Sequence, residues 1–301
     1  MKTPTHRVCA RACRLGACHA LLVLLALGLG GCAASGMRDT TLAPPHIDTR
    51  HQSANQDSRV RYLVLHYTEL DFPSALETLT RGSVSSHYLV SADPPRSYRL
   101  VPEERRAWHA GKSYWRGETA LNASSIGIEI VNPGPVDDAL RDFAPYPEAQ
   151  IDEVIRLVRD IVQRHGIAPH RILGHGDIAP QRKIDPGPRF PWHRLFEAGL
   201  IPWPDETQVA VREADYRAAV PAPAWFQTKL ARLGYEVPRS GVLDKATRRA
   251  LAIFQAKYLP SRYDGEADAR TAALLEVLNR PGGSVLRLKD GSLALFDFPA
   301  D

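Results

Sequence analysis

Short apolar strand segments and amphipathic helices follow one another between residues 59 and 175 without a strict strand–helix repeat. The run VRYLVLHY at 60–67 is typical of a buried strand. The stretch SIGIEIVN at 125–132 alternates strictly, so its isoleucines face one side and Glu129 faces the other. At 148–166, apolar residues recur every three or four positions up to a glycine, which predicts a helix. We therefore expect an α/β (α+β) fold, a central mixed sheet flanked by helices.

The same periodicities predict further strands and helices in the rest of the chain. Further strands are predicted at 85–92, 97–101 and 171–175, and a helix at 74–82. Near the C-terminus, GVLDKATRRAL and GEADARTAALL share the pattern G-x-x-D-x-x-T, with Asp244 and Asp268 placed to cap helices. Together with PAWFQTKLARLGY before them, they predict a small three-helix module. A hairpin is expected around Asp290 and Gly291, with no assigned role.

Composition changes divide the chain into six segments. These are a signal peptide at 1–31, a tether at 32–57, a large folded domain at 58–202, a charged and proline-edged linker at 203–221, the three-helix module at 222–280 and a tail at 281–301.

The N-terminus has the features of a targeting segment. A basic region precedes an apolar run that is too short for a membrane-spanning helix and ends in small residues. The sequence Leu-Gly-Gly-Cys ending at Cys32 resembles a bacterial lipobox, in which the cysteine is lipidated. Several acyl chains on one cysteine give a firm membrane anchor. Because Ala33 follows the cysteine, the expected location is the outer membrane, on its periplasmic face. An ordinary secretory signal is the alternative.

Charge and cysteine content narrow the function. Residues 1–31 contain four basic residues and no acid, and removing them leaves 34 basic and 34 acidic residues. A neutral mature chain gives no support for nucleic-acid binding, which needs a basic patch. All four cysteines lie within the first 32 residues, so the remainder has no disulfide and no thiolate metal ligand. Any metal must be held by nitrogen and oxygen.

Two histidines at the ends of predicted strands, His66 and His175, and the nearby Asp185 form such a donor set. Two imidazoles and one carboxylate are a ligand set for catalytic zinc, with a fourth position left for water. The loop from His175 to Asp185 lets the chain return to the same ion, and its prolines limit the ordering entropy lost on binding. Taken singly, each residue also has an interpretation without a metal. A histidine can be a hydrogen-bonded core residue, and a charged side chain can be solvated or ion-paired.

Two further residues suit hydrolysis at such a site. Glu129 is a carboxylate on an otherwise apolar strand face, where it must be paired or functional, and we expect it to accept the proton of the attacking water. Lys183 lies two residues before Asp185 and in an extended segment would point the same way. Its positive charge would stabilise an oxyanion.

Several motifs occur in an order that resembles a known family. YLVLHYT, SSHYLV, AWHAGKSYW, LNASSIGIEIVN and ILGHGDIAPQRKIDPGP resemble the zinc-dependent N-acetylmuramoyl-L-alanine amidases related to phage amidase-type lysozymes and peptidoglycan recognition proteins. The resemblance covers about residues 58–200, and 222–280 is similar to a peptidoglycan-binding module. Lipobox, amidase and module together resemble the outer-membrane lipoprotein amidases of enteric bacteria.

The resemblance implies roles for individual residues. His66, His175 and Asp185 would bind one zinc ion, and Glu129 and Lys183 would be catalytic. Some family members have cysteine where Asp185 stands. His109 would line the substrate groove, with Trp108 and Asn122 as further candidates, although packing beneath the groove is the alternative for all three.

The expected function is hydrolysis of the amide between the lactyl group of (anhydro-)N-acetylmuramic acid and L-alanine. The expected partners are peptidoglycan, muropeptides and the membrane that holds the lipid, with no nucleic acid and a monomeric state. One alternative is a non-catalytic peptidoglycan receptor. Another is a zinc murein peptidase, because SSHYLVSAD faintly resembles the ligand run of those enzymes through His87 and Asp93.

Overall fold

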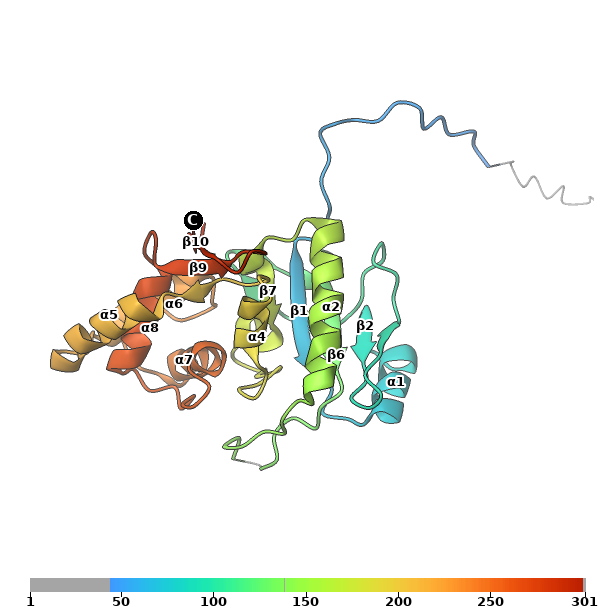
Figure 1. Ribbon diagram of the computed structural model, residues 1–301. Helices are drawn as coiled ribbons and strands as arrows, with labels where there is room; N and C mark the ends of the chain where they lie inside the picture. The colour runs from blue at the N-terminus through green and yellow to red at the C-terminus, as the bar shows by residue number, and fades with distance from the viewer. Residues whose placement is uncertain (1–43, 138, 300–301) are drawn as a thin grey trace, which may run out of the picture. The chain divides into compact units, whose positions relative to one another are not determined.

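A five-stranded sheet with β6 at its centre organises the larger part of the chain (Figure 1). Its order is β3-β2-β6-β1-β7; β2, β6, β1 and β7 are parallel, and β3 is antiparallel to β2. The expected mixed sheet is therefore confirmed. The strands are β1 Tyr62–Tyr67, β2 Tyr88–Val90, β3 Ser97–Arg99, β6 Ser125–Ile130 and β7 Ile172–Gly174.

This computed structural model describes residues 44–137 and 139–299, so the signal peptide and Cys32 lie outside the described residues. From Asn55 onward the chain forms one compact unit. Within the described ranges, no helix combines the length and apolar character needed to span a bilayer.

One face of the sheet packs on the long predicted helix. Helix α2, Glu148–His165, lies over the sheet alongside β1 in Figure 1 and ends at Gly166, which adopts the left-handed conformation. Its buried residues pack with Leu63 and Leu65 of β1, with the three isoleucines of β6, and with α4, Trp192–Glu197. Helix α1, Phe72–Arg81, covers β2 through a smaller apolar cluster. The alternation predicted for residues 125–132 is confirmed, because the isoleucines lie in this core.

The opposite face of β1 carries Tyr62, Val64 and His66, and its core continues into the C-terminal helices. Tyr62, Val64 and Leu173 belong to one buried cluster with residues of α6, α7 and α8. These helices are α6 Pro223–Leu233, α7 Lys245–Tyr258 and α8 Ala269–Leu278. The three-helix module therefore shares a hydrophobic core with the sheet.

The internal repeat of the module has a structural basis. Asp244 and Asp268 accept the backbone N–H groups of Thr247 and Thr271, which caps α7 and α8 as predicted. A buried glutamine on the preceding helix holds each capping loop. Gln227 and Gln255 each donate to the threonine hydroxyl and accept from a glycine N–H of the loop.

The segment predicted as a linker, 203–221, is not an extended connection. It contains β8, Trp203–Pro204, and α5, Glu206–Ala218. Arg270 of α8 forms ion pairs with two glutamates of α5, Glu206 and Glu213. The tail forms the expected hairpin, β9 Ser284–Arg287 and β10 Leu293–Phe296, and β9 pairs with β8.

The remaining elements are short. A two-stranded ribbon is formed by β4, Tyr114–Trp115, and β5, Glu118–Thr119. The 3-10 turns cover Leu121–Ala123 and Pro169–Arg171. The strand predicted at 171–175 ends one residue early, since His175 begins α3, His175–Ile178.

A buried ion pair joins α3 to the C-terminal module. Lys257 Nζ of α7 lies 3.0 Å from Asp177 Oδ2, and the Tyr235 hydroxyl donates to Asp177 Oδ1 at 2.6 Å. The Gly174 N–H also donates to Asp177 at 2.9 Å. Because Asp177 lies two residues after His175, the module supports the short helix that carries this histidine.

Replacing Lys257 with methionine is expected to lower the free energy of unfolding by about 3 kcal/mol, because the buried Asp177 carboxylate loses its cation. The measurement is urea unfolding of the full chain followed by circular dichroism. Lys245→Met, at an exposed position in the same helix, is the matched control. Equal midpoints for the two variants would show that the ion pair does not stabilise the fold.

Candidate metal centre and active site

Three adjacent parallel strands bring the predicted site residues together at their carboxyl ends. His66 of β1 and Glu129 of β6 are direct neighbours in the strand register. His175 follows β7, whose last residue, Gly174, pairs with Leu65. The chain returns after the loop because the Gly176 N–H donates to the Asp185 carbonyl at 2.8 Å. Strand order and loop closure thus place residues more than 100 positions apart at one point.

The three predicted metal ligands converge and are buried. His66 Nδ1 lies 2.9 Å from His175 Nδ1, and Asp185 Oδ2 lies 3.1 Å from each of these nitrogens. Tetrahedral zinc ligands lie roughly 3.3 Å apart, so this spacing is close to that of an occupied site. Within the described ranges, these residues form the one group of histidine and acidic side chains with metal-ligand spacing.

The protonation states also suit a cation. Burial, followed by the neighbouring His175, lowers the pKa of His66 to about 4. Burial alone would raise the pKa of Asp185, but the two imidazoles outweigh it and lower this pKa well below its usual range. At neutral pH the site therefore has a neutral His66 imidazole beside an ionised carboxylate.

A chain of hydrogen bonds fixes which nitrogen of His66 carries the proton. The Ser125 hydroxyl donates to the Leu121 carbonyl at 2.6 Å, so its oxygen accepts from His109 Nε2 at 3.1 Å. Burial lowers the pKa of His109 well below its ordinary value, and the neutral ring therefore presents an unprotonated Nδ1. This nitrogen accepts from His66 Nε2 at 3.0 Å. The lone pair of His66 is consequently on Nδ1, toward Asp185.

This assignment places two acceptors, His66 Nδ1 and Asp185 Oδ2, face to face at 3.1 Å. A proton on His175 Nδ1 would satisfy only one of them. A cation among the three donor atoms satisfies all, and neutral imidazole with carboxylate is a zinc ligand set. The residues therefore fit a divalent metal ion.

Glu129 lies beside this cluster and has no fixed partner for one oxygen. Its Oε1 is 4.0 Å from His66 Nδ1, and its buried Oε2 has no hydrogen-bond partner among the described residues. Burial and the nearby Asp185 raise the pKa of Glu129 well above its usual value, and Lys183 opposes this shift. A carboxyl group with a raised pKa beside a metal site suits proton transfer near neutral pH.

A cavity of about 260 Å³ opens over the cluster. Glu129, His175, Lys183 and Asp185 all line it. Lys183 is exposed while Asp185 is buried, and no carboxylate pairs with Lys183 among the described side chains. Lys183 thus borders the same cavity as His175 and Asp185, but it follows a turn, with its N–H donating to the Ala179 carbonyl at 3.0 Å, and not the extended segment that was expected.

The three predicted groove residues differ in position. Trp108 is 53% exposed, lines the cavity and carries the Arg106 guanidinium 4.0 Å from its ring centre. His109 lies on the cavity wall, but both ring nitrogens are engaged by His66 and Ser125. Asn122 does not line this cavity: its buried side chain accepts the N–H groups of His109 and Ala110. For Asn122 the alternative of packing beneath the groove applies.

The geometry disfavours the peptidase alternative. His87 Nδ1 accepts the Gly127 N–H at 3.1 Å, and its Nε2 donates to the Arg105 carbonyl at 3.1 Å. Both ring nitrogens are thus committed to backbone groups, and neither His87 nor Asp93 belongs to the donor cluster.

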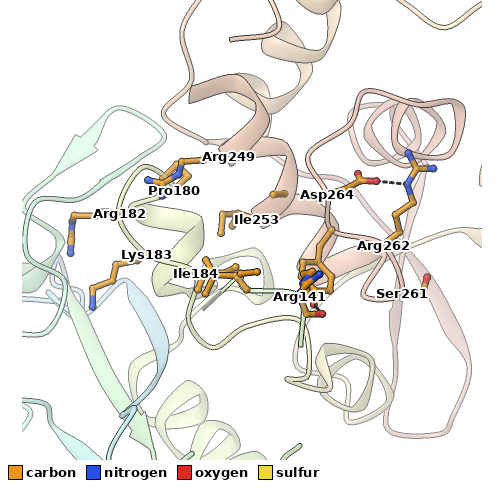
Figure 2. Close-up of a pocket in the computed structure, with 14 residues that line it drawn as sticks. Arg141, Pro180, Arg182, Lys183, Ile184, Arg249, Ile253, Ser261, Arg262 and Asp264 are labelled. Carbon is orange, nitrogen blue, oxygen red and sulfur yellow. Dashed lines mark hydrogen bonds and ion pairs between the residues drawn. The ribbon is translucent and has the colours of Figure 1, made fainter. Parts of the chain in front are cut away.

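A second cavity of about 510 Å³ is also lined by the loop that carries Lys183, together with residues of α7. Figure 2 shows Arg182 and Lys183 on one side of it and an ion pair of Arg262 with Asp264 on the opposite side. Because Arg182 and Lys183 line both cavities, the two spaces share a wall.

Comparison with known proteins places this site in a family. The N-acetylmuramoyl-L-alanine amidase family model matches residues 56–188, and a peptidoglycan binding domain model matches 220–275. The chain is 45% identical over 266 residues to the N-acetylmuramoyl-L-alanine amidase AmiD of Escherichia coli strain K12, covering 85% of this chain and 95% of that protein. The chain belongs to the N-acetylmuramoyl-L-alanine amidase family.

Two solved structures are similar to about three quarters of this chain. AmiD from E. coli, in complex with anhydro-N-acetylmuramic acid-L-Ala-D-γ-Glu-L-Lys, matches with a TM-score of 0.69 and 44% identity, covering 76% of this chain and 92% of that one. AmpDh3 from Pseudomonas aeruginosa, in complex with an anhydromuramic pentapeptide, matches with a TM-score of 0.72 and 39% identity, covering 77% and 96%.

In this amidase, sequence reasoning missed the residues that support the metal ligands. Ser125 and Gly127 share the strand face of Glu129, and that period of two was the available signal. A Cβ at Gly127 would lie 2.5 Å from His109 Cγ, so only glycine lets this ring approach the strand. Ser125 then supplies the acceptor that orients the ring.

Proposed function

We propose that the protein is a zinc-dependent amidase that hydrolyses the bond between the lactyl group of N-acetylmuramic acid and L-alanine of a peptidoglycan stem peptide. The observation that carries this proposal is the buried cluster of two imidazoles and one carboxylate beside Glu129, whose Oε2 has no partner among the described residues. The substrate in the AmiD complex contains this bond, in the anhydro form of the sugar. Family membership and the peptidoglycan binding domain support the same substrate class.

In this proposal His66, His175 and Asp185 hold one zinc ion through Nδ1, Nδ1 and Oδ2. When bound, zinc would supply a Lewis acid for the amide carbonyl and for the attacking water. The nitrogen and oxygen donors and the absence of cysteine after Cys32 favour zinc in a three-ligand catalytic site over a structural thiolate site.

Two further side chains take part in this proposed reaction, one by transferring a proton and one by stabilising the negative charge that forms on the carbonyl oxygen. Glu129 accepts the proton of the attacking water and returns it to the leaving nitrogen of L-alanine. Its Oε1 lies 4.0 Å from His66 Nδ1, and its Oε2 has no hydrogen-bond partner among the described residues. Lys183 lines the same cavity and places a positive charge where the carbonyl oxygen becomes negative. Trp108 offers an exposed aromatic face at the rim for the amino sugar.

The location of the enzyme follows from its predicted anchor. We propose that Cys32 is lipidated and holds the protein at the periplasmic face of the outer membrane. The C-terminal module would then keep the protein on peptidoglycan. The sequence pattern of residues 29–33 and the match of residues 220–275 support this arrangement.

Product analysis tests the function. The purified protein is incubated with muropeptides, with and without a chelator, and products are identified by mass spectrometry. We expect intact stem peptides with a free L-alanine N-terminus, and no product after chelation. Shortened stem peptides would indicate a peptidase, and binding without any product would indicate a receptor.

Ser125→Ala tests the hydrogen-bond chain that orients His66. Without the hydroxyl acceptor the His109 ring is no longer held in one tautomer, and we expect zinc affinity to fall about tenfold. The measurement is competition with a chromogenic chelator, which is independent of activity. Ser91→Ala, at a buried serine bonded to backbone carbonyls elsewhere, is the control. Identical affinity in both variants would contradict the role of Ser125.

A further inference from the structure

The 510 Å³ cavity beside the active site is lined by more cations than acids, although residues 32–301 are neutral as a whole. Below, this cavity is called the basic groove. The described residues that line it include five cations and one acid: Arg141, Arg182, Lys183, Arg249, Arg262 and Asp264. The only acid is paired with Arg262 at 2.9 Å. Two of the five cations are balanced by ion pairs, Arg141 with Asp137 and Arg262 with Asp264 and Asp268. The excess positive charge of the groove therefore comes from Arg182, Lys183 and Arg249, and such an excess attracts anions.

The cations nearest the active site have no carboxylate partner among the described residues. Arg249 of α7 donates to the Gln181 carbonyl, and Arg182 donates to the carbonyls of Ala110 and Lys112. These backbone contacts hold each guanidinium in place and leave its charge unneutralised. The adjacent Arg248 differs, since it forms an ion pair with Glu266.

The groove also continues the active site. Arg182 and Lys183 line both the 260 Å³ catalytic cavity and the basic groove. The catalytic cavity is smaller than most ligand pockets, so an amino sugar carrying several amino acids must extend beyond it. Figure 2 shows Arg182 and Lys183 on the same side of the groove as Arg249.

The charges of the substrate indicate whether its sugar or its peptide extends into the basic groove. Once its lactyl group is in the amide, the muramic sugar has no carboxylate. A peptide such as L-Ala-D-γ-Glu-L-Lys has two, the α-carboxylate left free by the γ linkage and the C-terminal carboxylate. We propose, on the basis of the amidase function above, that the basic groove binds the carboxylates of the stem peptide, with Arg249 of the C-terminal module as a binding residue.

Two synthetic substrates test this proposal with the full, metal-loaded chain. One is anhydro-N-acetylmuramic acid-L-Ala-D-γ-Glu-L-Lys, and the other has both free carboxylates converted to amides. In the unchanged protein we expect KM for the diamide to be about tenfold higher. In Arg249→Ala the ratio should fall to about threefold, because the groove cation is lost. Arg249→Lys should recover most of the ratio, and Arg248→Ala should leave it unchanged.

The outcomes separate this proposal from the function on which it rests. If the unchanged protein cleaves neither substrate, the amidase function fails. If it cleaves both with equal KM, or if Arg249→Ala keeps the tenfold ratio, the groove does not bind the carboxylates while the amidase function stands. An equal rise in KM for both substrates in Arg249→Ala would show that the arginine acts only on the loop through Gln181.

Discussion

Glu129→Gln is expected to reduce turnover of muropeptides about 10³-fold while one metal ion remains bound per chain. The amide keeps the shape of the side chain but cannot accept the proton of the attacking water. None of the three ligand atoms is altered, so metal binding should persist. The measurements are kcat on a soluble muropeptide and metal content of the same sample by mass spectrometry.

Stability gives an independent check on this variant. The Oε2 atom of Glu129 is buried and has no hydrogen-bond partner among the described residues, so an amide of the same shape loses no hydrogen bond and removes any desolvation cost of the ionised form. We expect the unfolding midpoint of the metal-free Glu129→Gln protein to be unchanged or higher. Glu77→Gln, on the exposed side of α1, should alter neither activity nor stability. Full activity in a metal-loaded Glu129→Gln protein would remove Glu129 from the mechanism.

His175→Ala is expected to abolish both metal binding and hydrolysis. One of three donor atoms is lost, and the remaining His66 and Asp185 form a two-ligand site that cannot retain zinc through purification. Metal content should fall from about one ion per chain to near zero. His193→Ala, at a histidine whose side chain is 56% exposed, should retain the metal and the activity.

A structural control accompanies the loss of His175. The far-UV circular dichroism spectrum should match that of the unchanged protein, because α3 remains held by the contacts of Asp177 with Lys257 and Tyr235. A folded His175→Ala protein that still contains one metal ion and cleaves muropeptides would show that the ion binds elsewhere.

The candidate metal ligands and the candidate proton acceptor could be predicted because each residue lies at a defined point of a strand, helix or sequence motif. His66 and Glu129 lie near the ends of strongly apolar strands whose period of two assigns their faces. His175 and Asp185 bound a proline-rich loop whose length suits a return to one ion. The central mixed sheet and the helix that ends at Gly166 follow from the same periodicities.

Other features depend on contacts that local patterns do not encode. Helix α5 has one buried residue, Val209, and its contacts with α8 include the ion pairs of Arg270, so it lacks the apolar stripe that identifies a helix. The role of His109 depends on Ser125 and on a ring far away in the sequence, His66. The shared core of the sheet and the C-terminal helices likewise arises only in three dimensions.

Anomalous diffraction at the zinc edge, from crystals of protein that hydrolyses muropeptides, tests the central claim most directly. We predict one peak at about 2.0–2.2 Å from His66 Nδ1, His175 Nδ1 and Asp185 Oδ2. Active crystals with no peak among these three atoms, or with the ion bound by other residues, would contradict the proposed metal centre.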